Sequence, residues 1–381
     1  MTVINKQSLT KIPLILMVIS IILIPFAGCD LICLHQGENN ESGWIIEKEP
    51  SKVGDGYKYK VCKTCGKKTD EVVIPYIDDT ELKYSINEDG KTCTITGVGS
   101  YQNSTLEIPE YIKAYKVTVI AEEAFANCTF LTSIDIPDSV TCISYAAFCY
   151  CTSLTSIDIP DSVISIGAAA FYECKSLTSI KIPDSVTSIG VGAFDFCTSL
   201  ANVVIGNSVT NIDDDVFFNC ISLESIVIPD SVTSIGDCAF YLCRSLKTIE
   251  IPNLVTSIGD SAFFGCKSLE SIDIPNSVTS IGETAFYNCT SLASIDIPDS
   301  VANISRGAFY NCISLTSIEI PDSVTSIGSQ AFDDCASLTS ITFEGTVEQW
   351  RAIEKGNNWN RGIPATKVIC TDGTVTLEQI E

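Results

Sequence analysis

The chain has 381 residues and a formal net charge of −24, because 47 Asp and Glu residues outnumber 23 Lys and Arg residues. A field of this sign repels phosphate backbones, so we expect no nucleic-acid partner. His35 is the only histidine, which excludes any mechanism that needs a histidine base in the repeats described below.

Residues 1–28 have the features of a secretory signal peptide. Two lysines precede an apolar run from Ile12 to Ala27, and this run of about 16 residues is shorter than the roughly 20 that a membrane-spanning helix needs. It ends in Phe26-Ala27-Gly28-Cys29, which resembles a bacterial lipobox, although Phe26 stands where leucine or a similar aliphatic residue is usual. The resemblance implies that Cys29 becomes the lipid-modified first residue of the mature protein. An uncleaved anchor and a signal cleaved without lipid attachment are the alternatives.

Residues 29–77 contain four candidate ligands for a structural zinc ion. Cys33 and His35 lie two residues apart, and Cys62 and Cys65 form a CxxC turn that is followed by glycine. Two sulfurs from one turn, with one sulfur and one imidazole nitrogen from another, complete the four sites that Zn²⁺ prefers. The alternative is a disulfide between Cys62 and Cys65, or one to Cys33. The segment also resembles small zinc-ribbon-like modules of bacterial surface proteins, through Trp44, Glu49-Pro50 and the CxxCG turn.

Residues 78–105 have the pattern of a β-hairpin. Leu82–Ile86 and Thr92–Thr96 flank Asn87-Glu88-Asp89-Gly90, whose residues favour a tight turn. We expect this hairpin to cap the open end of the repeats that follow, because an uncovered edge invites aggregation.

Residues 106–343 consist of a repeated unit, which is degenerate in Leu106–Cys128 and then recurs every 23 residues without insertion. One copy, Leu177–Ser199, reads LTSIKIPDSVTSIGVGAFDFCTS. A strict period in this range, with leucine and isoleucine at fixed offsets, indicates a solenoid in which each unit forms one rung. The cysteine of the unit recurs at Cys128, Cys151, Cys174, Cys197, Cys220, Cys243, Cys266, Cys289, Cys312 and Cys335.

Each unit contains three segments with inward-facing apolar residues. The Ile-x-Ile alternation predicts a short parallel strand with both isoleucines on one face, and the following proline ends it. A valine and an isoleucine form a second short extended segment, and the glycine after it permits a bend. The spacing of the alanine, phenylalanine and cysteine suits one helical turn. In the copy quoted above, these inward residues are Leu177, Ile180, Ile182, Val186, Ile189, Ala193, Phe194 and Cys197.

The pattern LxxIxIPxSVxxIGxxAFxxC resembles the leucine-rich repeats of BspA-like bacterial surface proteins, and it covers Leu106–Phe343. The resemblance implies a leucine-rich-repeat solenoid displayed on a cell surface, whose known relatives are associated with adhesion to host proteins or to other cells. Some departures fall on the proline or the glycine of the unit, and we expect their rungs to turn differently. Gly206 replaces the proline, and Ser144, Asp213 and Ser305 replace the glycine.

Ten of the 19 cysteines fall on the cysteine position of the repeat. We interpret them as small apolar thiols that are buried inside the solenoid. The alternative is a ladder of disulfides between rungs, because the distance between stacked strands permits such bonds.

Residues 344–381 have the pattern of a closing module. Val347, Trp350 and Ile353 recur every three residues, so one face of a short helix is apolar. The segment resembles the carboxy-terminal closing module of the same family, including Trp359 and Cys370-Thr371-Asp372-Gly373. We expect a lid over the last rung, and an exposed aromatic ligand site is the alternative.

The residues between the inward isoleucines point to solvent and form a column along the solenoid. Repeat proteins bind along such extended surfaces, and carboxylates would meet basic segments of a partner. The charged residues that we assign to a binding surface are Asp135, Asp158, Lys181, Glu250, Asp273, Asp296 and Glu319. A second column follows the prolines and has the residue types of turns: Asp138, Asp161, Asp184, Asn207, Asp230, Asn253, Asn276, Asp299 and Asp322.

We therefore expect a lipid-anchored protein on the extracellular face of a bacterial membrane or on the cell surface, which binds a protein of a host or of a neighbouring cell. The first alternative is a structural or self-associating envelope component without a foreign ligand. A carbohydrate-active enzyme is a remote alternative, because paired carboxylates can be drawn from any two columns and nothing singles out one pair. We expect no catalytic residues.

Mass spectrometry of the mature amino terminus tests the predicted lipid anchor. We expect the mature chain to begin at Cys29 and to carry the added mass of a lipid, because the end of the apolar run resembles a lipobox. An unmodified amino terminus at another residue would contradict this expectation.

Overall fold

The computed structural model describes residues 45–48, 56–61, 68–74 and 82–377, and the chain divides into two compact units, Met1–Asp78 and Asp79–Glu381. In the first unit β1 (Ile45–Lys48), β2 (Gly56–Val61) and β3 (Lys68–Ile74) form an antiparallel sheet in the order β1-β2-β3. The candidate lipid and zinc residues stay predictions, because they lie outside the described residues: Cys29, Cys33, His35, Cys62 and Cys65.

The second unit begins with the predicted hairpin. β4 (Lys83–Ile86) and β5 (Thr92–Gly97) pair antiparallel. β5 then pairs in parallel with β8 (Tyr115–Ile120), while β7 (Tyr111–Ile112) folds back on β8. Ile95 of β5 is completely buried in the same core as the repeats. The hairpin therefore covers the first end of the solenoid, as predicted.

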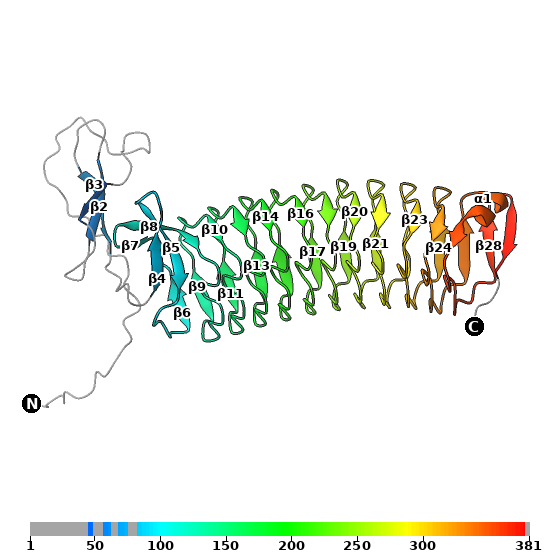
Figure 1. The fold of residues 1–381 in the computed structure, drawn as a ribbon, viewed down its shortest axis with the longest axis horizontal. Helices are drawn as coiled ribbons and strands as arrows, with labels where there is room; N and C mark the ends of the chain where they lie inside the picture. The colour runs from blue at the N-terminus through cyan, green and yellow to red at the C-terminus, as the bar shows by residue number, and fades with distance from the viewer. Residues whose placement is uncertain (1–44, 49–55, 62–67, 75–81, 378–381) are drawn as a thin grey trace, which may run out of the picture. The chain divides into compact units, whose positions relative to one another are not determined.

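After β8 the rungs contribute short strands to two parallel ladders (Figure 1). Residues 23 positions apart are paired, for example Ser225 with Thr248 and Ile226 with Ile249, so the register does not drift. The first ladder contains β6 (Thr105–Glu107), β9 (Ser133–Asp135), β11 (Ser156–Asp158), β13 (Ser179–Lys181), β15 (Asn202–Val204), β17 (Ser225–Val227), β19 (Thr248–Glu250), β21 (Ser271–Asp273), β24 (Ser317–Ile320) and β26 (Ser340–Phe343). The second contains β10 (Cys142–Ile143), β12 (Ser165–Ile166), β14 (Ser188–Ile189), β16 (Asn211–Ile212), β18 (Ser234–Ile235), β20 (Ser257–Ile258), β22 (Ser280–Ile281), β23 (Asn303–Ile304), β25 (Ser326–Ile327) and β27 (Glu354–Lys355).

The interior is a stack of equivalent side chains. Ten phenylalanines from Phe125 to Phe332 lie ring on ring, with neighbouring centroids 5.3 to 5.7 Å apart and planes within 16° of parallel. The leucines from Leu131 to Leu338 are also completely buried. Each row thus covers the row before it, which confirms the predicted solenoid.

The repeat cysteines are buried free thiols. Nine of them donate their S–H group to the backbone carbonyl of a phenylalanine in the preceding part of the stack, at 3.0 to 3.2 Å, as Cys243 does to Phe217. All cysteines within residues 82–377 are free. The interpretation as buried thiols is therefore confirmed, and the alternative of a disulfide ladder is not.

The expected helical turn is instead a run of tight turns. Within the first regular rung, Glu123 and Asn127 have left-handed backbone angles, with φ values of 54° and 61°. These angles direct alternate N–H groups out of the rung: Phe125 donates to the carbonyl of Ala147 in the next rung at 2.8 Å, while Ala126 donates back to Glu123 at 3.1 Å. A regular helix would keep both bonds inside the rung. The turns therefore add a further backbone connection between rungs.

The repeat glycines are required by close approach between rungs. A Cβ atom on Gly282 would lie 2.5 Å from the backbone of Asp260, and one on Gly167 would lie 2.5 Å from Ser144. Neither glycine has a positive φ angle, so the predicted bend does not explain them. The missing side chain lets the backbones meet, and the N–H group of Gly282 donates to Ile258 at 2.9 Å.

Two of the three glycine replacements interrupt the second ladder, as expected. The ladder breaks between β14 and β16, next to Asp213, and between β22 and β23, next to Ser305. At the second break the Ser305 hydroxyl donates to the carbonyl of Ile281 at 2.6 Å, where other rungs use the backbone N–H group. Ser144 keeps that backbone bond, to Ile120 at 3.0 Å, so its rung does not differ.

The carboxy-terminal segment closes the other end of the solenoid. α1 (Val347–Ala352) starts with a capping box between Thr346 and Gln349, and it buries Trp350 against Phe343. β28 (Lys367–Cys370) joins the first ladder beside β26 and pairs with β29 (Gly373–Thr376). Because Trp350 is 2 % exposed, the predicted lid is confirmed. Within the described ranges, no helix has the length and apolar character that crossing a membrane requires.

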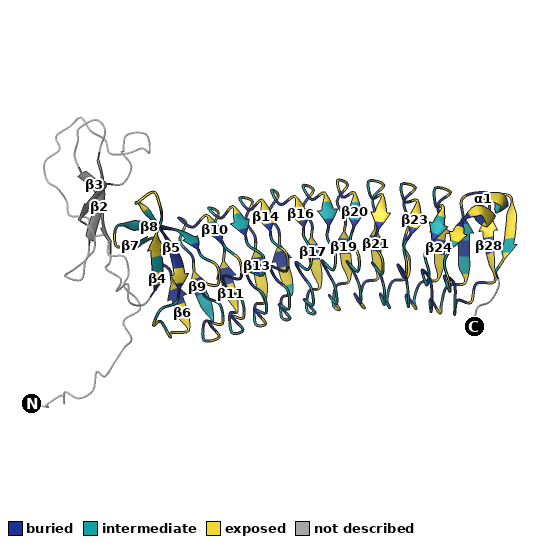
Figure 2. Ribbon diagram, viewed as in Figure 1, coloured by how far each residue is buried: buried dark blue, intermediate teal, exposed yellow. Residues whose placement is uncertain are grey.

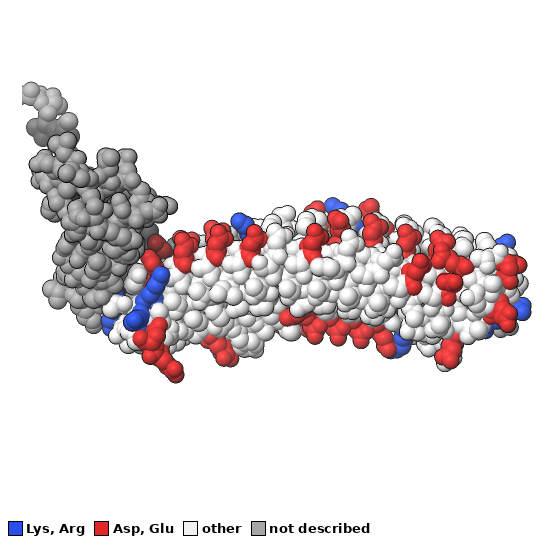
Figure 3. Space-filling view, turned by 90° about the horizontal axis from the view of Figure 1, so that it is seen from above, with Lys and Arg blue, Asp and Glu red and all other residues white. Residues whose placement is uncertain are grey.

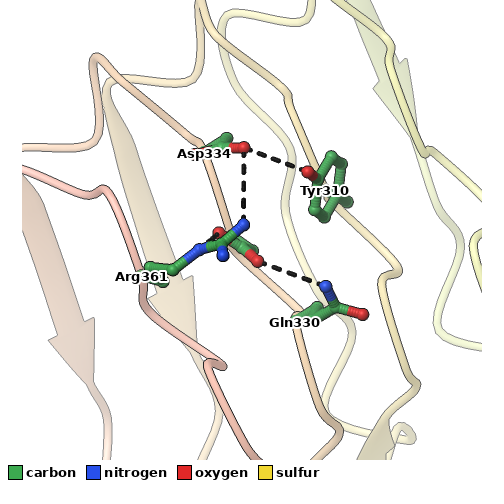
Figure 4. Close-up of polar contacts among 5 residues, drawn as sticks. Tyr310, Gln330, Asp334 and Arg361 are labelled. Atoms are coloured by element: carbon green, nitrogen blue, oxygen red, sulfur yellow. Dashed lines mark hydrogen bonds and ion pairs between the residues drawn. The ribbon is translucent and has the colours of Figure 1, made fainter. Parts of the chain in front are cut away.

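A polar network ties this closing module to the last rungs (Figure 4). The Nε atom of Arg361 lies 2.8 Å from the carboxylate of Asp333, which is completely buried, and a second nitrogen lies 3.9 Å from Asp334. The Tyr310 hydroxyl donates to Asp334 at 3.0 Å, and the Gln330 amide lies 3.4 Å from Asp333. Since a buried carboxylate requires a partner, Arg361 holds the lid in register with the stack.

Truncation of one inward leucine tests the stacked core. We expect Leu223→Ala to lower the free energy of unfolding by about 2–5 kcal/mol, because it leaves a cavity between two rungs. The matched control is Val227→Ala in the same rung, since Val227 is 76 % exposed and should contribute little to stability. Urea unfolding followed by circular dichroism compares the two midpoints. Equal midpoints would contradict the packing described here.

Candidate functional site

The predicted binding residues all lie on the outward side of the first ladder, which we call the strand face. In these strands a buried residue is followed by a more exposed one, as Ile157 is by Asp158. Figure 2 shows buried and exposed segments alternating along the ladder. The backbone register places Asp135 beside Asp158 and Glu250 beside Asp273, and a bridge pairs Asp296 with Glu319. The structure thus brings these positions into one column. The outward residues, in order, are Glu107, Asp135, Asp158, Lys181, Val204, Val227, Glu250, Asp273, Asp296, Glu319 and Thr342.

Two exposed valines divide the column into two acidic parts. Val204 and Val227 are 57 % and 76 % exposed, and they lie side by side in neighbouring strands. Lys181 pairs with Val204 on one side, and Glu250 pairs with Val227 on the other. Both valines belong to the predicted outward column, but they are missing from the predicted binding residues because those were selected by charge. Their position in the repeat could have identified them, because the other apolar residues of the unit occupy inward positions and these two valines occupy an outward one.

The four carboxylates after the valines have no partner within the described part of the chain. Glu250, Asp273, Asp296 and Glu319 take part in none of its side-chain hydrogen bonds or ion pairs. The nearby ammonium of Lys247 is paired with Glu224 instead, at 3.1 Å. We call these four residues the acidic run. Its charge faces solvent without compensation.

Threonine hydroxyls hold neighbouring rungs together, as Thr155 does by donating to the carbonyl of Thr132 at 3.0 Å. In the column after the prolines, Asp184 accepts the backbone N–H group of Asn207 in the next rung at 2.8 Å, which is a bond between rungs and not one within a turn. Within residues 82–377, Asp138, Asp161 and Asp230 of the same column make no such bond, so this column is engaged at Asp184 and not along its length.

A third acidic column was not identified from the sequence. Asp214, Asp237 and Asp260 each accept the backbone N–H group of the next rung at 2.6 to 2.7 Å, and Glu283 pairs with Arg306 at 3.7 Å. The sequence does mark this column, because the residue that follows the glycine position is acidic in four consecutive rungs. Figure 3 shows rows of acidic side chains that run along the solenoid. Because three of the four carboxylates bind backbone, this column supports the fold.

A hollow of about 330 Å³ lies where the strand face meets the closing module. Its lining contains Glu319 at the end of the acidic run and Glu344, which follows the last repeat. Partial burial, and then the carboxylates of Glu319, Asp299 and Asp322, raise the pKa of Glu344. The sequence analysis did not find Glu344 because it lies outside the repeat pattern. The full lining is Glu319, Thr342, Phe343, Glu344, Cys370 and Thr371.

A second aromatic column lies on the turn side of the rungs. Its rings stack in parallel with centroids 4.5 to 4.6 Å apart, from Phe218 through Tyr241 to Tyr310. Because each ring covers the face of the next, the column offers ring edges to solvent. Sugars and cations bind ring faces, so we assign this column a structural role.

Asp195 occupies an aromatic position of that column, between Tyr172 and Phe218. One of its carboxylate oxygens is buried without a hydrogen-bond partner among the described residues. Burial, with the nearby charges of Asp215 and Glu173, raises the pKa of Asp195 to about 7. The neighbouring Phe196 supplies the ring of this rung instead, with centroids 6.0 Å from Tyr172 and 5.6 Å from Phe218. Within residues 82–377, no group of three or more His, Cys, Asp or Glu side chains is arranged to hold a metal ion.

Replacement of Asp195 should change how stability depends on pH. The folded pKa of about 7 lies above the ordinary value of 3.8, so the stability gained with the protonated carboxyl is lost as the pH rises through about 7. We expect the Tm of the wild type to fall relative to that of Asp195→Asn between about pH 4 and pH 7, and the difference to be constant above that. Asp138→Asn, in an exposed turn, is the control and should give a constant difference. Parallel curves for the wild type and Asp195→Asn would contradict the assignment.

Comparison with known proteins agrees with this architecture. The model of the BspA type leucine rich repeat region matches residues 118–247 and 233–353, which together exceed half of the chain. A leucine-rich repeat protein from Bacteroides ovatus is 29 % identical, with a TM-score of 0.50, over 77 % of this chain and 90 % of its own. A leucine rich cell surface protein from Faecalibacterium prausnitzii is 30 % identical, with a TM-score of 0.42, over 73 % of this chain and 97 % of its own.

The pneumococcal vaccine antigen PcpA shares the fold, with a TM-score of 0.52 at 22 % identity, over 76 % of this chain and 88 % of its own. No curated protein matches the chain at a significant level. The repeat pattern, the two parallel ladders and the family match agree with one another. The chain therefore belongs to the family of BspA-type leucine-rich repeat proteins.

Proposed function

We propose that this chain is a bacterial surface protein that binds other proteins through its strand face. The observation that carries the proposal is the acidic run beside Val204 and Val227. These side chains are exposed, ordered by the ladder, and without partners in the described part of the chain. Exposed polar and apolar side chains without partners, held on a rigid repeat surface, are typical of a recognition site.

The relatives support the same role at the level of the family. Two of the similar structures are described as a leucine rich cell surface protein and as a vaccine antigen. We further propose attachment to a membrane through a lipid on Cys29, supported by the signal-like sequence before it. A structural zinc ion held by Cys33, His35, Cys62 and Cys65 stays a proposal that rests on their spacing.

A matched pair of charge variants tests the strand face. The first variant is Glu250→Gln, Asp273→Asn and Asp296→Asn, and the control is Asp138→Asn, Asp161→Asn and Asp230→Asn in the column after the prolines. Both remove three exposed carboxylates. Proteins cross-linked to the immobilised full chain are identified by mass spectrometry, purified, and measured one by one for Kd.

We expect at least one purified protein to bind the wild type and the control alike, and to bind the strand-face variant at least about tenfold more weakly, a loss of about 1.4 kcal/mol. Partners that bind all three forms equally would contradict the role of the strand face. Light scattering that shows the full chain binding only to itself would favour the alternative of a self-associating envelope component.

A further inference from the structure

The acidic run leads from the exposed valines toward the closing module. It places one carboxylate on each of four consecutive rungs, Glu250, Asp273, Asp296 and Glu319. Paired strands are about 4.8 Å apart, so the run extends over about 14 Å. Side chains on one face of an extended polypeptide recur about every 6.8 Å. Three basic side chains of such a segment therefore match the length of the run.

The hollow gives this run a defined end. Glu319 is both the last carboxylate of the run and part of the lining, and Glu344 belongs to the same lining. The negative charges of two further carboxylates, Asp299 and Asp322, also contribute to the raised pKa of Glu344. A cation at this point would relieve repulsion among four acids. The volume of about 330 Å³ is at the lower limit for small-molecule sites and suits one long side chain.

The lining also fits the stem of such a side chain. Phe343 is buried beneath the lining, at 1 % exposure, while Thr342 and Thr371 line the hollow nearer the surface. A lysine or arginine has an apolar stem below a charged head, which matches a wall of this composition. A bare divalent ion would need six to eight oxygens, whereas no described group of acidic side chains is arranged to hold a metal.

From this juxtaposition we propose that the partner presents an extended basic segment along the acidic run, with one lysine or arginine side chain in the hollow between the last rung and the closing module. Apolar side chains at the other end of the segment pack on Val204 and Val227. The proposal rests on the proposed function, because it names the partner chemistry of the same strand face. It also identifies Glu344, outside the repeats, as the anchoring residue together with Glu319.

Fluorescence anisotropy with labelled peptides tests this assignment on the full chain. The probe is VSVSKSKSK, whose valines and lysines share one face when extended, and the matched peptide is VSVSESESE. The anchor variant is Glu319→Gln with Glu344→Gln. The control variant is Asp138→Asn with Asp161→Asn, which makes the same change in net charge at the other end of the solenoid.

We expect the lysine peptide to bind the wild type and the control variant within twofold of each other. Binding to the anchor variant should be at least tenfold weaker, and it should weaken further in salt because screening reduces the attraction. Circular dichroism and Tm confirm that both variants fold. Equal losses in the two variants, equal binding of the glutamate peptide, or no binding of the lysine peptide would overturn the assignment.

Failure here is distinguishable from failure of the proposed function. If the lysine peptide does not bind while purified partners still depend on the strand-face carboxylates, the anchoring assignment is wrong and the binding role stands. If those partners are unaffected by the strand-face variant, the binding role itself is wrong.

Discussion

Contact between equivalent side chains of successive rungs is the interaction on which the rest of this structure depends. From Phe125 to Leu338 no residue is inserted between one rung and the next, so each phenylalanine, leucine and cysteine there meets its own counterpart. The backbone also makes equivalent contacts from rung to rung. Strand pairs, glycine contacts and turn N–H groups connect positions that are 23 residues apart or nearly so. Each rung is supported only by its neighbours. A capped stack is the consequence, with the hairpin at one end and the tryptophan-containing lid at the other.

The same order creates the surface that we assign to binding. A residue that lies between two buried isoleucines of a strand must point to solvent. The outward residues therefore form a straight column whether or not they contact one another. Some carboxylates elsewhere are engaged, as Asp237 is by the backbone of the next rung and Asp333 by Arg361. Within residues 82–377 the acidic run has no such engagement. Its charge is therefore available to a partner, and the rigid ladder removes part of the ordering cost that a flexible site would incur.

Much of this architecture follows from the sequence, because a fixed period determines which residues meet. The buried thiols and the inward phenylalanines were predicted on that basis, whereas the hairpin and the lid were predicted from their own local patterns. The turns were not, since the left-handed angles of Glu123 and Asn127 arise from bonds to the next rung that a single unit does not reveal. Close approach, and not a bend, explains Gly282 for the same reason. The hollow beside Glu344 was also missed, because it forms where the last repeat meets a segment outside the pattern.

Reaction of the native full chain with iodoacetamide at about pH 8, mapped by mass spectrometry, tests the stacked interior most directly. Burial raises the pKa of Cys289 and Cys335 to about 12, and the thiolate is the reactive form. We expect the nine hydrogen-bonded thiols of the repeat to stay unmodified in the native chain, and to react fully once the chain is unfolded without a reductant. Rapid modification of these thiols in the native chain, or their failure to react after unfolding, would contradict the account.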